Sequence, residues 1–382
     1  EVAGGVGESG SGKSMTAMAV MQLLPVGTQW SGSIQLDGKA LESLTESEMC
    51  DLRGNDIGMV FQEPMTALNP VQTIGDQVSE TILVHTGKSR AEARQIAREA
   101  LDRVGLPADL FPLDRYPHDL SGGQRQRVVI AMSIALRPKL LIADEPTTAL
   151  DVTTQAQILT LLKRLVDEDG MGLILITHDL AVVADMADHI VIMKDGEVVE
   201  EGDTLDLFRR MKHPYTKALF EASSHVPARN PVPVDGRGEP VVQVSNVVRD
   251  YPLPRRSLFK APGHFRAVDD VSLAIRRGEN VGLVGESGCG KSTLTRAILA
   301  LDPIQGGEIR LNGATFSSRG EGPDRTMRRR VQVVFQDPYS SFNPRHRVER
   351  LIAEPFHLLD QPPEGQERRK RIDTALTNVG LT

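Results

Sequence analysis

An internal repeat constrains this chain more than any other feature of its sequence. The eight residues GESGSGKS at positions 7–14 return as GESGCGKS at positions 285–292, which is 278 residues later. A second pair, VFQEP at 60–64 and VFQDP at 334–338, recurs at a spacing of 274 residues. Solenoid repeats have periods of about 20 to 50 residues, so a period this long indicates a duplicated domain. The chain is therefore predicted to contain two homologous domains in series.

The segment between the two copies has the composition of a linker. Residues 223–240 contain four prolines, two glycines and few large apolar side chains. Each proline fixes its own backbone angle and favours an extended conformation in the residue before it. A length of 382 residues also exceeds what one hydrophobic core usually serves. We therefore expect a first domain at 1–222, a linker at 223–240 and a second domain at 241–382.

The two copies are expected to be cut at different points. Residues 241–244 and 267–275 have the apolar character of strands and precede the second copy of the repeat. No residues before 7–14 correspond to these two segments. The counterpart of residues 120–124 in the second copy would fall beyond position 382. We interpret the sequence as a piece of a longer protein, without the first strands of domain one and the C-terminal half of domain two.

The repeated residues match the phosphate-binding pattern GxxxxGK[ST] in both copies. In the second copy an apolar run at 281–284 leads into the glycines, and residues 293–300 behind them have helical character. In this strand, loop and helix order the glycines turn backbone N–H groups toward phosphates, the lysine reaches the β- and γ-phosphates, and the following serine ligates Mg²⁺. The alternative is a tight turn made by the glycines alone, against which two copies of the pattern argue.

The pattern thus predicts two sites for ATP with Mg²⁺. The first consists of Gly7, Glu8, Ser9, Gly10, Ser11, Gly12, Lys13 and Ser14. The second consists of Gly285, Glu286, Ser287, Gly288, Cys289, Gly290, Lys291 and Ser292. Ser14 and Ser292 are the expected metal ligands among them.

Two further apolar runs end in side chains that can bind a metal ion or transfer a proton. Residues 139–145, KLLIADE, have the pattern of a buried strand that ends in Asp144 and Glu145. Ligands gather at the carboxyl ends of parallel strands, where Asp144 can hold Mg²⁺ through water and Glu145 can polarise the attacking water. The alternative is a carboxylate pair that caps the turn before Pro146. A third run, ILITHD at 174–179, ends near His178, and an isolated histidine is more often structural.

The residues Leu120-Ser121-Gly122-Gly123-Gln124 identify the family. A phosphate loop, a glutamine after an apolar strand, LSGGQ, a strand ending in Asp-Glu, a Leu-Asp pair and a strand-end histidine, in that order, resemble the ATP-binding cassette (ABC) ATPases. The match covers the first domain after its missing start and about half of the second. The resemblance implies an α/β fold of two tandem nucleotide-binding domains. Each would have a P-loop α/β core, an antiparallel β subdomain and a helical subdomain that carries the signature LSGGQ.

The resemblance also implies roles for individual residues. Gln62 and Gln336 would sense Mg²⁺ and the γ-phosphate, His178 would be the switch histidine, and Asp151 would belong to the D-loop. The signature residues are Ser121, Gly122, Gly123 and Gln124. They have the character of a second anion site at a helix N-terminus. The resemblance implies that they face a nucleotide held by the opposite domain. Tyr251 is similar to the aromatic residue that stacks on adenine, with a packed surface tyrosine as the alternative.

Other segments are similar to one branch of the family. Residues 63–70 (EPMTALNP), 143–151 (ADEPTTALD) and 213–219 (HPYTKAL) are similar to dipeptide, oligopeptide and nickel importer ATPases, and the tandem arrangement to glutathione- or peptide-import ATP-binding subunits of bacteria. This implies ATP-driven uptake of a small peptide, two transmembrane permease subunits, a periplasmic substrate-binding protein, and a peripheral location at the cytoplasmic face of the inner membrane. We expect residues 63–82 and 337–352 to contact the permeases.

Composition weighs against other classes of protein. The 44 basic and 51 acidic residues give a net charge of −7, which argues against a surface dedicated to nucleic acid. No apolar stretch approaches the roughly 18 residues that span a bilayer. Two cysteines, Cys50 and Cys289, are too few for a disulfide scaffold and fit a reducing cytosol. A soluble tandem ABC ATPase that acts on ribosomes or nucleic acid is the alternative function, against which the acidic balance and the short linker argue.

Overall fold

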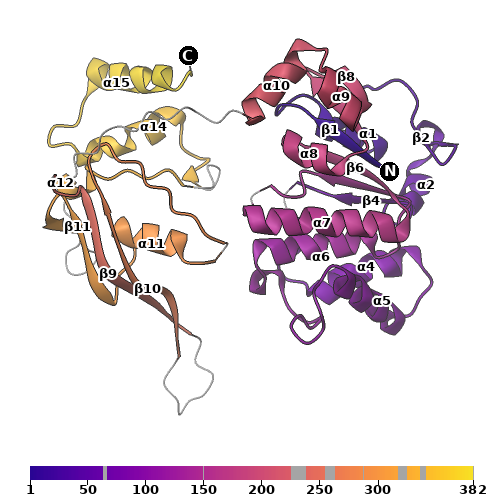
Figure 1. Ribbon diagram of the computed structural model, residues 1–382, viewed down its shortest axis with the longest axis horizontal. Helices are drawn as coiled ribbons and strands as arrows, with labels where there is room; N and C mark the ends of the chain where they lie inside the picture. The colour runs from indigo at the N-terminus through magenta and orange to yellow at the C-terminus, as the bar shows by residue number, and fades with distance from the viewer. Residues whose placement is uncertain are drawn as a thin grey trace. The chain divides into compact units, whose positions relative to one another are not determined.

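The computed structural model describes residues 1–62, 67–148, 150–224, 238–253, 263–286, 288–316, 325–335 and 341–381. The chain divides into two compact units, Glu1–Ala228 and Arg229–Thr382 (Figure 1). Two of the predicted site residues, Ser287 and Gln336, lie outside the described residues, as does most of the predicted linker. No helix in the described part of the chain is long and apolar enough to cross a membrane.

The first unit is built on a six-stranded sheet. Its strand order is β4-β5-β6-β1-β7-β8, in which all neighbours are parallel except the antiparallel pair β7 and β8. The strands are β1 (Val2–Val6), β4 (Ile57–Val60), β5 (Leu140–Asp144), β6 (Gly172–Thr177), β7 (His189–Lys194) and β8 (Glu197–Asp203). Continuous apolar runs such as β5 and β6 are typical of parallel strands buried on both faces, and both strands were expected from the sequence.

Helices cover both faces of this sheet (Figure 1). On β5, Ile142 packs in a cluster with Ala17 of the first helix, whereas Leu141 and Ala143 pack in the main core with residues of α6 and α7. The helices are α1 (Lys13–Val20), α2 (Glu46–Leu52), α4 (Ile74–His85), α5 (Arg90–Arg103), α6 (Gly122–Ile134), α7 (Val152–Asp169), α8 (Leu180–Met186), α9 (Thr204–Arg210) and α10 (Pro214–Ser224). Helices α4, α5 and α6 contact one another and form a helical lobe.

The second unit is built on an antiparallel sheet. Its order is β10-β9-β11-β12, formed by β9 (Val242–Pro252), β10 (His264–Ile275), β11 (Gly306–Leu311) and β12 (Ala314–Thr315). Helix α11 (Lys291–Ile298) contributes Leu294 and Ala297 to the core of this sheet. The described residues that follow include the helices α12 (Arg325–Arg328), α14 (Val348–Ala353) and α15 (Gly365–Asn378). The strands expected at 241–244 and 267–275 correspond to β9 and β10.

The strand predicted at 281–284 and the apolar run at 331–335 do not form strands. Val284 is 93% exposed and Val334 is 98% exposed. Their counterparts in the first unit, β1 and β4, are hydrogen-bonded to β5, β6 and β7, and the described residues of the second unit contain no equivalent of those three strands. In place of the four-stranded antiparallel sheet of the second unit, the described residues of the first unit show a two-stranded antiparallel sheet of β2 (Gln35–Leu36) and β3 (Lys39–Ala40). The two units therefore display different parts of the expected fold.

Candidate functional site

The first phosphate loop joins the end of β1 to the start of α1. Gly10 and Gly12 have φ angles of 85° and 99°, in the left-handed region that glycine adopts without strain. The ammonium of Lys13 donates to the carbonyl oxygens of Gly7 (2.7 Å) and Glu8 (2.8 Å), which close the loop around it. Burial lowers the pKa of Lys13, and the charges of Glu145 and Asp144 oppose that shift. This geometry is typical of an anion-binding loop at a helix N-terminus.

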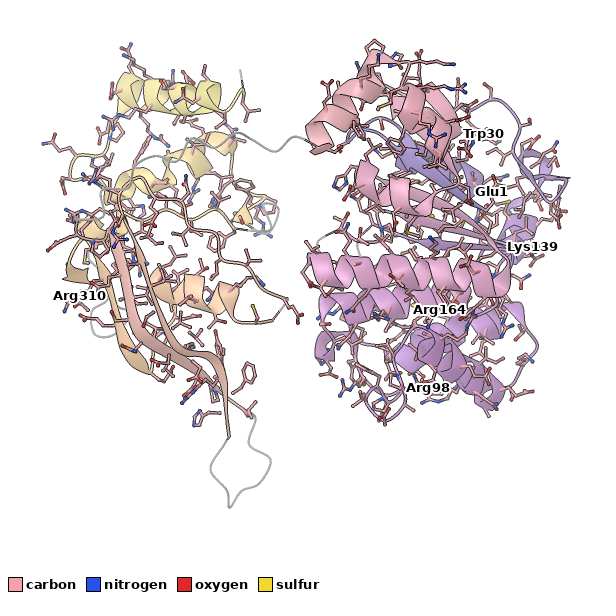
Figure 2. All side chains as sticks on the ribbon, viewed as in Figure 1. Glu1, Trp30, Arg98, Lys139, Arg164 and Arg310 are labelled. Carbon is pink, nitrogen blue, oxygen red and sulfur yellow. The ribbon has the colours of Figure 1, made fainter. Side chains whose placement is uncertain are left out.

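Asp144, at the carboxyl end of β5, lies beside this loop. Its side chain is 4% exposed, and its Oδ1 atom has no hydrogen-bond partner among the described residues. Burial raises the pKa of Asp144, a hydrogen bond from Ser14 lowers it, and the charge of Glu145 raises it further. Figure 2 labels Lys139, just before the opposite end of β5, where it pairs with Asp37 at 2.9 Å. The candidate site thus occupies only the carboxyl edge of the sheet, as expected for parallel strands.

Glu145 is the centre of the site. Its φ of 46° is unusual for a residue other than glycine, and its N–H donates to the carbonyl of Ile176 on β6 at 2.9 Å. This conformation directs the carboxylate toward three side chains: the Nε2 of Gln62 at 3.2 Å, the Oγ1 of Thr148 at 2.7 Å and the Nδ1 of His178 at 3.3 Å. The three come from the loops after β4, β5 and β6, so the sheet itself brings the predicted residues together.

The signature residues lie at the start of α6 and next to the start of α7. Ser121 caps α6: its Oγ accepts from the N–H of Gln124 (3.3 Å), and its own N–H donates to Gln124 Oε1 (2.9 Å). Asp151 caps α7 through Thr154, whose N–H and Oγ1 it accepts at 3.0 and 2.8 Å. Ser121 and Gly122 are exposed, so the N-terminus of α6 is open to a ligand.

The second phosphate loop repeats the geometry of the first. The ammonium of Lys291 donates to the carbonyl oxygens of Gly285 and Glu286, both at 2.6 Å, and approaches Cys289 Sγ at 3.6 Å. Gly290, before α11, has a φ of 96°. Gly288 also has a left-handed backbone, and Ser292 is exposed in the first turn of α11.

Tyr251 lies on β9 with two polar contacts. Its hydroxyl donates to Asp302 Oδ2 at 3.3 Å, and the guanidinium carbon of Arg249 lies 4.3 Å from the centre of its ring. These contacts fix the ring, and its assignment to adenine remains a prediction.

Sequence reasoning missed two residues of the first site. Thr148 lies three positions after Glu145, a spacing at which a threonine hydroxyl commonly returns to a preceding acceptor, so the pattern could have been noticed. Tyr215 lies within residues 213–219, for which the sequence indicated a family resemblance but no role in the site. Its hydroxyl accepts a hydrogen bond from the N–H of Glu8 at 3.1 Å, across 207 positions of sequence, and no local pattern predicts such a contact.

Comparison with known proteins agrees with this geometry. The family described as ABC transporter matches residues 1–148 and 268–382. The chain is 44% identical over 409 residues to the glutathione import ATP-binding protein GsiA of Escherichia coli (strain K12) and of Shigella sonnei (strain Ss046). Each alignment covers 98% of this chain and 65% of the relative, so the chain spans about 65% of the length of these relatives.

Solved structures include cbiO1 from Clostridium perfringens, part of the ABC transporter complex cbiONQ. It is 30% identical, with a TM-score of 0.48 over 58% of this chain and 87% of that one. Since the family matches well over half of the residues, in both units and over both phosphate loops, this chain belongs to the ABC transporter family.

Proposed function

We propose that the full-length protein is the ATP-hydrolysing subunit of an ABC importer that takes up small peptides such as glutathione. The observation that carries the ATPase assignment is the convergence of Gln62, Thr148 and His178 on Glu145, next to the loop that holds Lys13. The relatives named as glutathione import ATP-binding proteins support the importer over a soluble ATPase that acts on ribosomes or nucleic acid. Residues 1–222 and 241–382 would belong to its two nucleotide-binding domains.

In this proposal the two phosphate loops bind ATP. The ammonium groups of Lys13 and Lys291 would contact the β- and γ-phosphates, and the loop N–H groups would surround them. Each lysine is held in its loop by two carbonyl oxygens, so its ammonium already lies at the proposed phosphate site. Ser121 and the glycine amides at the start of α6 would offer a further N–H cluster to a phosphate.

The residues of the first site also fit Mg²⁺. The unpaired Oδ1 of buried Asp144 and the hydroxyl of Ser14 beside it are oxygen ligands of the kind Mg²⁺ prefers, and Gln62 is a third candidate. The described residues contain no group of three or more His, Cys, Asp or Glu able to hold a metal alone, so the ion would depend on phosphate oxygens for further ligands. When bound, Mg²⁺ neutralises charge on the phosphates. In the second site Ser292 and Gln336 would be its ligands.

Glu145 would orient and deprotonate the attacking water. Hydrogen bonds from Gln62 and Thr148 and the approach of His178 hold its carboxylate in one orientation, and positioning is a large part of catalysis in phosphoryl transfer. The side chain is 16% exposed and that of His178 is 65% exposed, so the site remains open to water.

The proposed partners are two permease subunits and a periplasmic substrate-binding protein. Residues 63–82 and 337–352 are the proposed permease contacts; residues 63–66 and 337–340 among them lie outside the described residues. In the first unit a groove of about 600 Å³ in this region exposes apolar and charged side chains of α4 and α5, as a surface for a helix of a partner requires; it is lined by Gln72, Asp76, Ser79, Glu80, Leu83, Val84, Arg90 and Arg94. We infer a peripheral location at the cytoplasmic face of the bacterial inner membrane.

The variant Glu145→Gln tests the proposal. It keeps the size of the side chain and its contact with Gln62 but removes the base, so ATP binding should persist while turnover at this site falls of order 10²–10⁴-fold. The measurement is ATP hydrolysis by the full-length protein with its second loop disabled by Lys291→Ala. Hydrolysis that equals that of the Lys291→Ala parent would refute the role of Glu145.

A further inference from the structure

One peptide group of the first phosphate loop is held from both sides. The carbonyl of Gly7 accepts from the ammonium of Lys13 at 2.7 Å, and the N–H of the same peptide group, which belongs to Glu8, donates to the hydroxyl of Tyr215 at 3.1 Å. In a trans peptide the C=O and N–H groups point in opposite directions. Lys13 and Tyr215 therefore fix the rotation of this peptide together, and neither contact alone would do so.

Tyr215 is itself held firmly at the start of α10. The ammonium of Lys194 lies 5.2 Å from the centre of the Tyr215 ring. The backbone N–H of Tyr215 donates to Nδ1 of His213 at 3.2 Å. Glu200 on β8 anchors this turn, because its carboxylate accepts from the N–H of His213 (3.1 Å) and from the hydroxyl of Thr216 (2.6 Å). Burial raises the pKa of Glu200, but these hydrogen bonds outweigh it and the net pKa is lowered. The carboxylate is thus kept charged for its anchoring role.

The turn between β7 and β8 supports the same loop. A Cβ atom on Gly7 would lie 2.2 Å from the carbonyl oxygen of Met193, so backbone packs directly against backbone there. The N–H of Gly196 donates to the carbonyl of Ser11 at 3.2 Å. The outer side of the phosphate loop is therefore braced by the β7–β8 turn and by α10, while its mouth, at Glu8, Ser9 and Gly10, is exposed.

We propose that Tyr215 is a positioning residue for nucleotide binding, which holds the Gly7–Glu8 peptide so that the loop is organised before ATP arrives. The inference rests on the proposed ATP site and assigns α10 a role in it. The contact of Tyr215 with the loop is the hydrogen bond that it accepts from the N–H of Glu8, so it acts through the backbone of that residue. Its hydroxyl, and not the bulk of its ring, is the group that matters.

The expected consequence is a change in affinity with little change in turnover. A neutral hydrogen bond contributes about 0.5–1.5 kcal/mol, which corresponds to a factor of roughly 2 to 10 in a binding constant. Tyr215→Phe should therefore weaken ATP binding about 2- to 10-fold. Because the same loop geometry serves both the bound substrate and the transition state, KM should rise with the dissociation constant while kcat stays within about twofold.

The test uses the full-length protein with the second loop disabled by Lys291→Ala. Equilibrium binding of a non-hydrolysable ATP analogue and the KM and kcat for ATP are measured with and without Tyr215→Phe. Ser223→Ala removes another hydroxyl from α10, whose hydrogen-bond acceptors among the described residues lie in its own helix, and should leave both constants unchanged. Lys194→Met, which removes the cation above the ring, should weaken binding in the same direction by a smaller factor.

The outcomes separate this inference from the proposed function. If the Lys291→Ala parent binds no nucleotide, the first site does not bind ATP and the proposed function fails. If the parent binds and Tyr215→Phe binds equally well, the site stands and the role of Tyr215 is refuted. A fall in kcat without a rise in KM would also refute it. A loss of binding that only follows a fall in melting temperature, and is shared by Ser223→Ala, would reduce Tyr215 to a structural residue.

Discussion

At the scale of single residues, the candidate site surrounds one carboxylate with three side chains and leaves one oxygen atom of the other without a hydrogen-bond partner among the described residues. Glu145 accepts contacts from three loops, whereas Asp144, one position earlier, is buried with an oxygen atom that no described residue satisfies. A buried unpaired carboxylate oxygen costs free energy of order 1–3 kcal/mol or more. A cation bound beside this oxygen atom would remove the free-energy penalty. Asp144 is thus the residue at which stability and metal binding should trade against each other.

The variant Asp144→Asn tests this trade. Burial raises the pKa of Asp144, so the native state holds its proton more tightly than the unfolded chain does. Stability therefore falls as the pH rises from the ordinary aspartate range through the raised pKa, and the penalty is complete above it. In ATP-free buffer with a chelator, Asp144→Asn should melt at a higher temperature than the parent at mildly alkaline pH. The gain should shrink in acidic buffer.

The control for this variant is Asp51→Asn, at an exposed position of α2, which should change nothing. The variant should also lose the stabilisation that Mg²⁺ with ATP gives to the parent. A lower melting temperature for Asp144→Asn at mildly alkaline pH would show that the contacts with Ser14 and Lys13 outweigh the burial of the Asp144 carboxylate, and would contradict the prediction.

At the scale of elements, sequence predicted what local contacts determine and failed where distant strands decide. The loop at Lys291 forms because its hydrogen bonds reach only five and six residues back, to Glu286 and Gly285. The apolar run at 281–284 has the same local signal as β1, yet it stays exposed. A strand needs neighbours to satisfy its backbone groups, and the second unit's described residues include no equivalents of β6 and β7.

The same distinction holds within the site. The order of motifs identified Gln62, Asp144, Glu145 and His178, because the family resemblance encodes their meeting at one sheet edge. It gave no chemical role to Tyr215, whose contact with the phosphate loop depends on how α10 packs after more than two hundred intervening residues. Pattern and resemblance therefore predicted the residues that meet at the edge of the sheet, and missed a residue that supports them from a distant helix.

The contact between α6 and α7 supports a prediction at this scale. A Cβ atom on Gly123 would lie 2.3 Å from Cγ2 of Thr154, whose rotamer is held by its hydrogen bond to Asp151. Gly123→Ala should destabilise the protein by about 1–3 kcal/mol through overpacking, despite the better helix propensity of alanine. Gly122→Ala, whose Cβ would meet only Leu150 at an ordinary 3.6 Å, is the matched control and should be neutral or slightly stabilising.

Denaturant unfolding of the three proteins measures both effects. Combining Gly123→Ala with Thr154→Ser, which removes the clashing methyl group and keeps the hydroxyl, should restore most of the lost stability. If Gly123→Ala is as stable as Gly122→Ala, the close packing of the signature segment against α7 does not limit the fold.

At the scale of the whole molecule, the two units present different charges at equivalent positions of the proposed permease contact. Residues 71–76, VQTIGD, carry one acidic side chain and no basic one, whereas residues 345–350, RHRVER, carry three arginines and one glutamate. Thr73 caps α4 by accepting from the N–H of Asp76 at 3.2 Å, but the equivalent Arg347 makes no such cap for α14. Losing a threonine cap typically costs about 0.5–2 kcal/mol. We interpret this exchange as a sign that Arg347 serves the proposed permease contact.

We therefore expect the loop at 345–350 to contact acidic side chains of a permease and the loop at 71–76 not to. Arg345, Arg347 and Arg350 are all exposed. Among the described residues that line their hollow of about 380 Å³, the one acidic side chain is Glu349, which pairs with Arg368 at 3.5 Å. Arg347→Lys keeps the positive charge and adds an amine that a carbodiimide can couple to a carboxylate in direct contact. In the complex purified with its permeases in detergent, this variant should yield a permease adduct through position 347.

Thr73→Lys, the matched variant in the other loop, should yield little, because a basic or neutral partner surface offers no carboxylate. Equal adducts from both variants, or none from Arg347→Lys in an assembled complex, would show that charge does not distinguish the two loops.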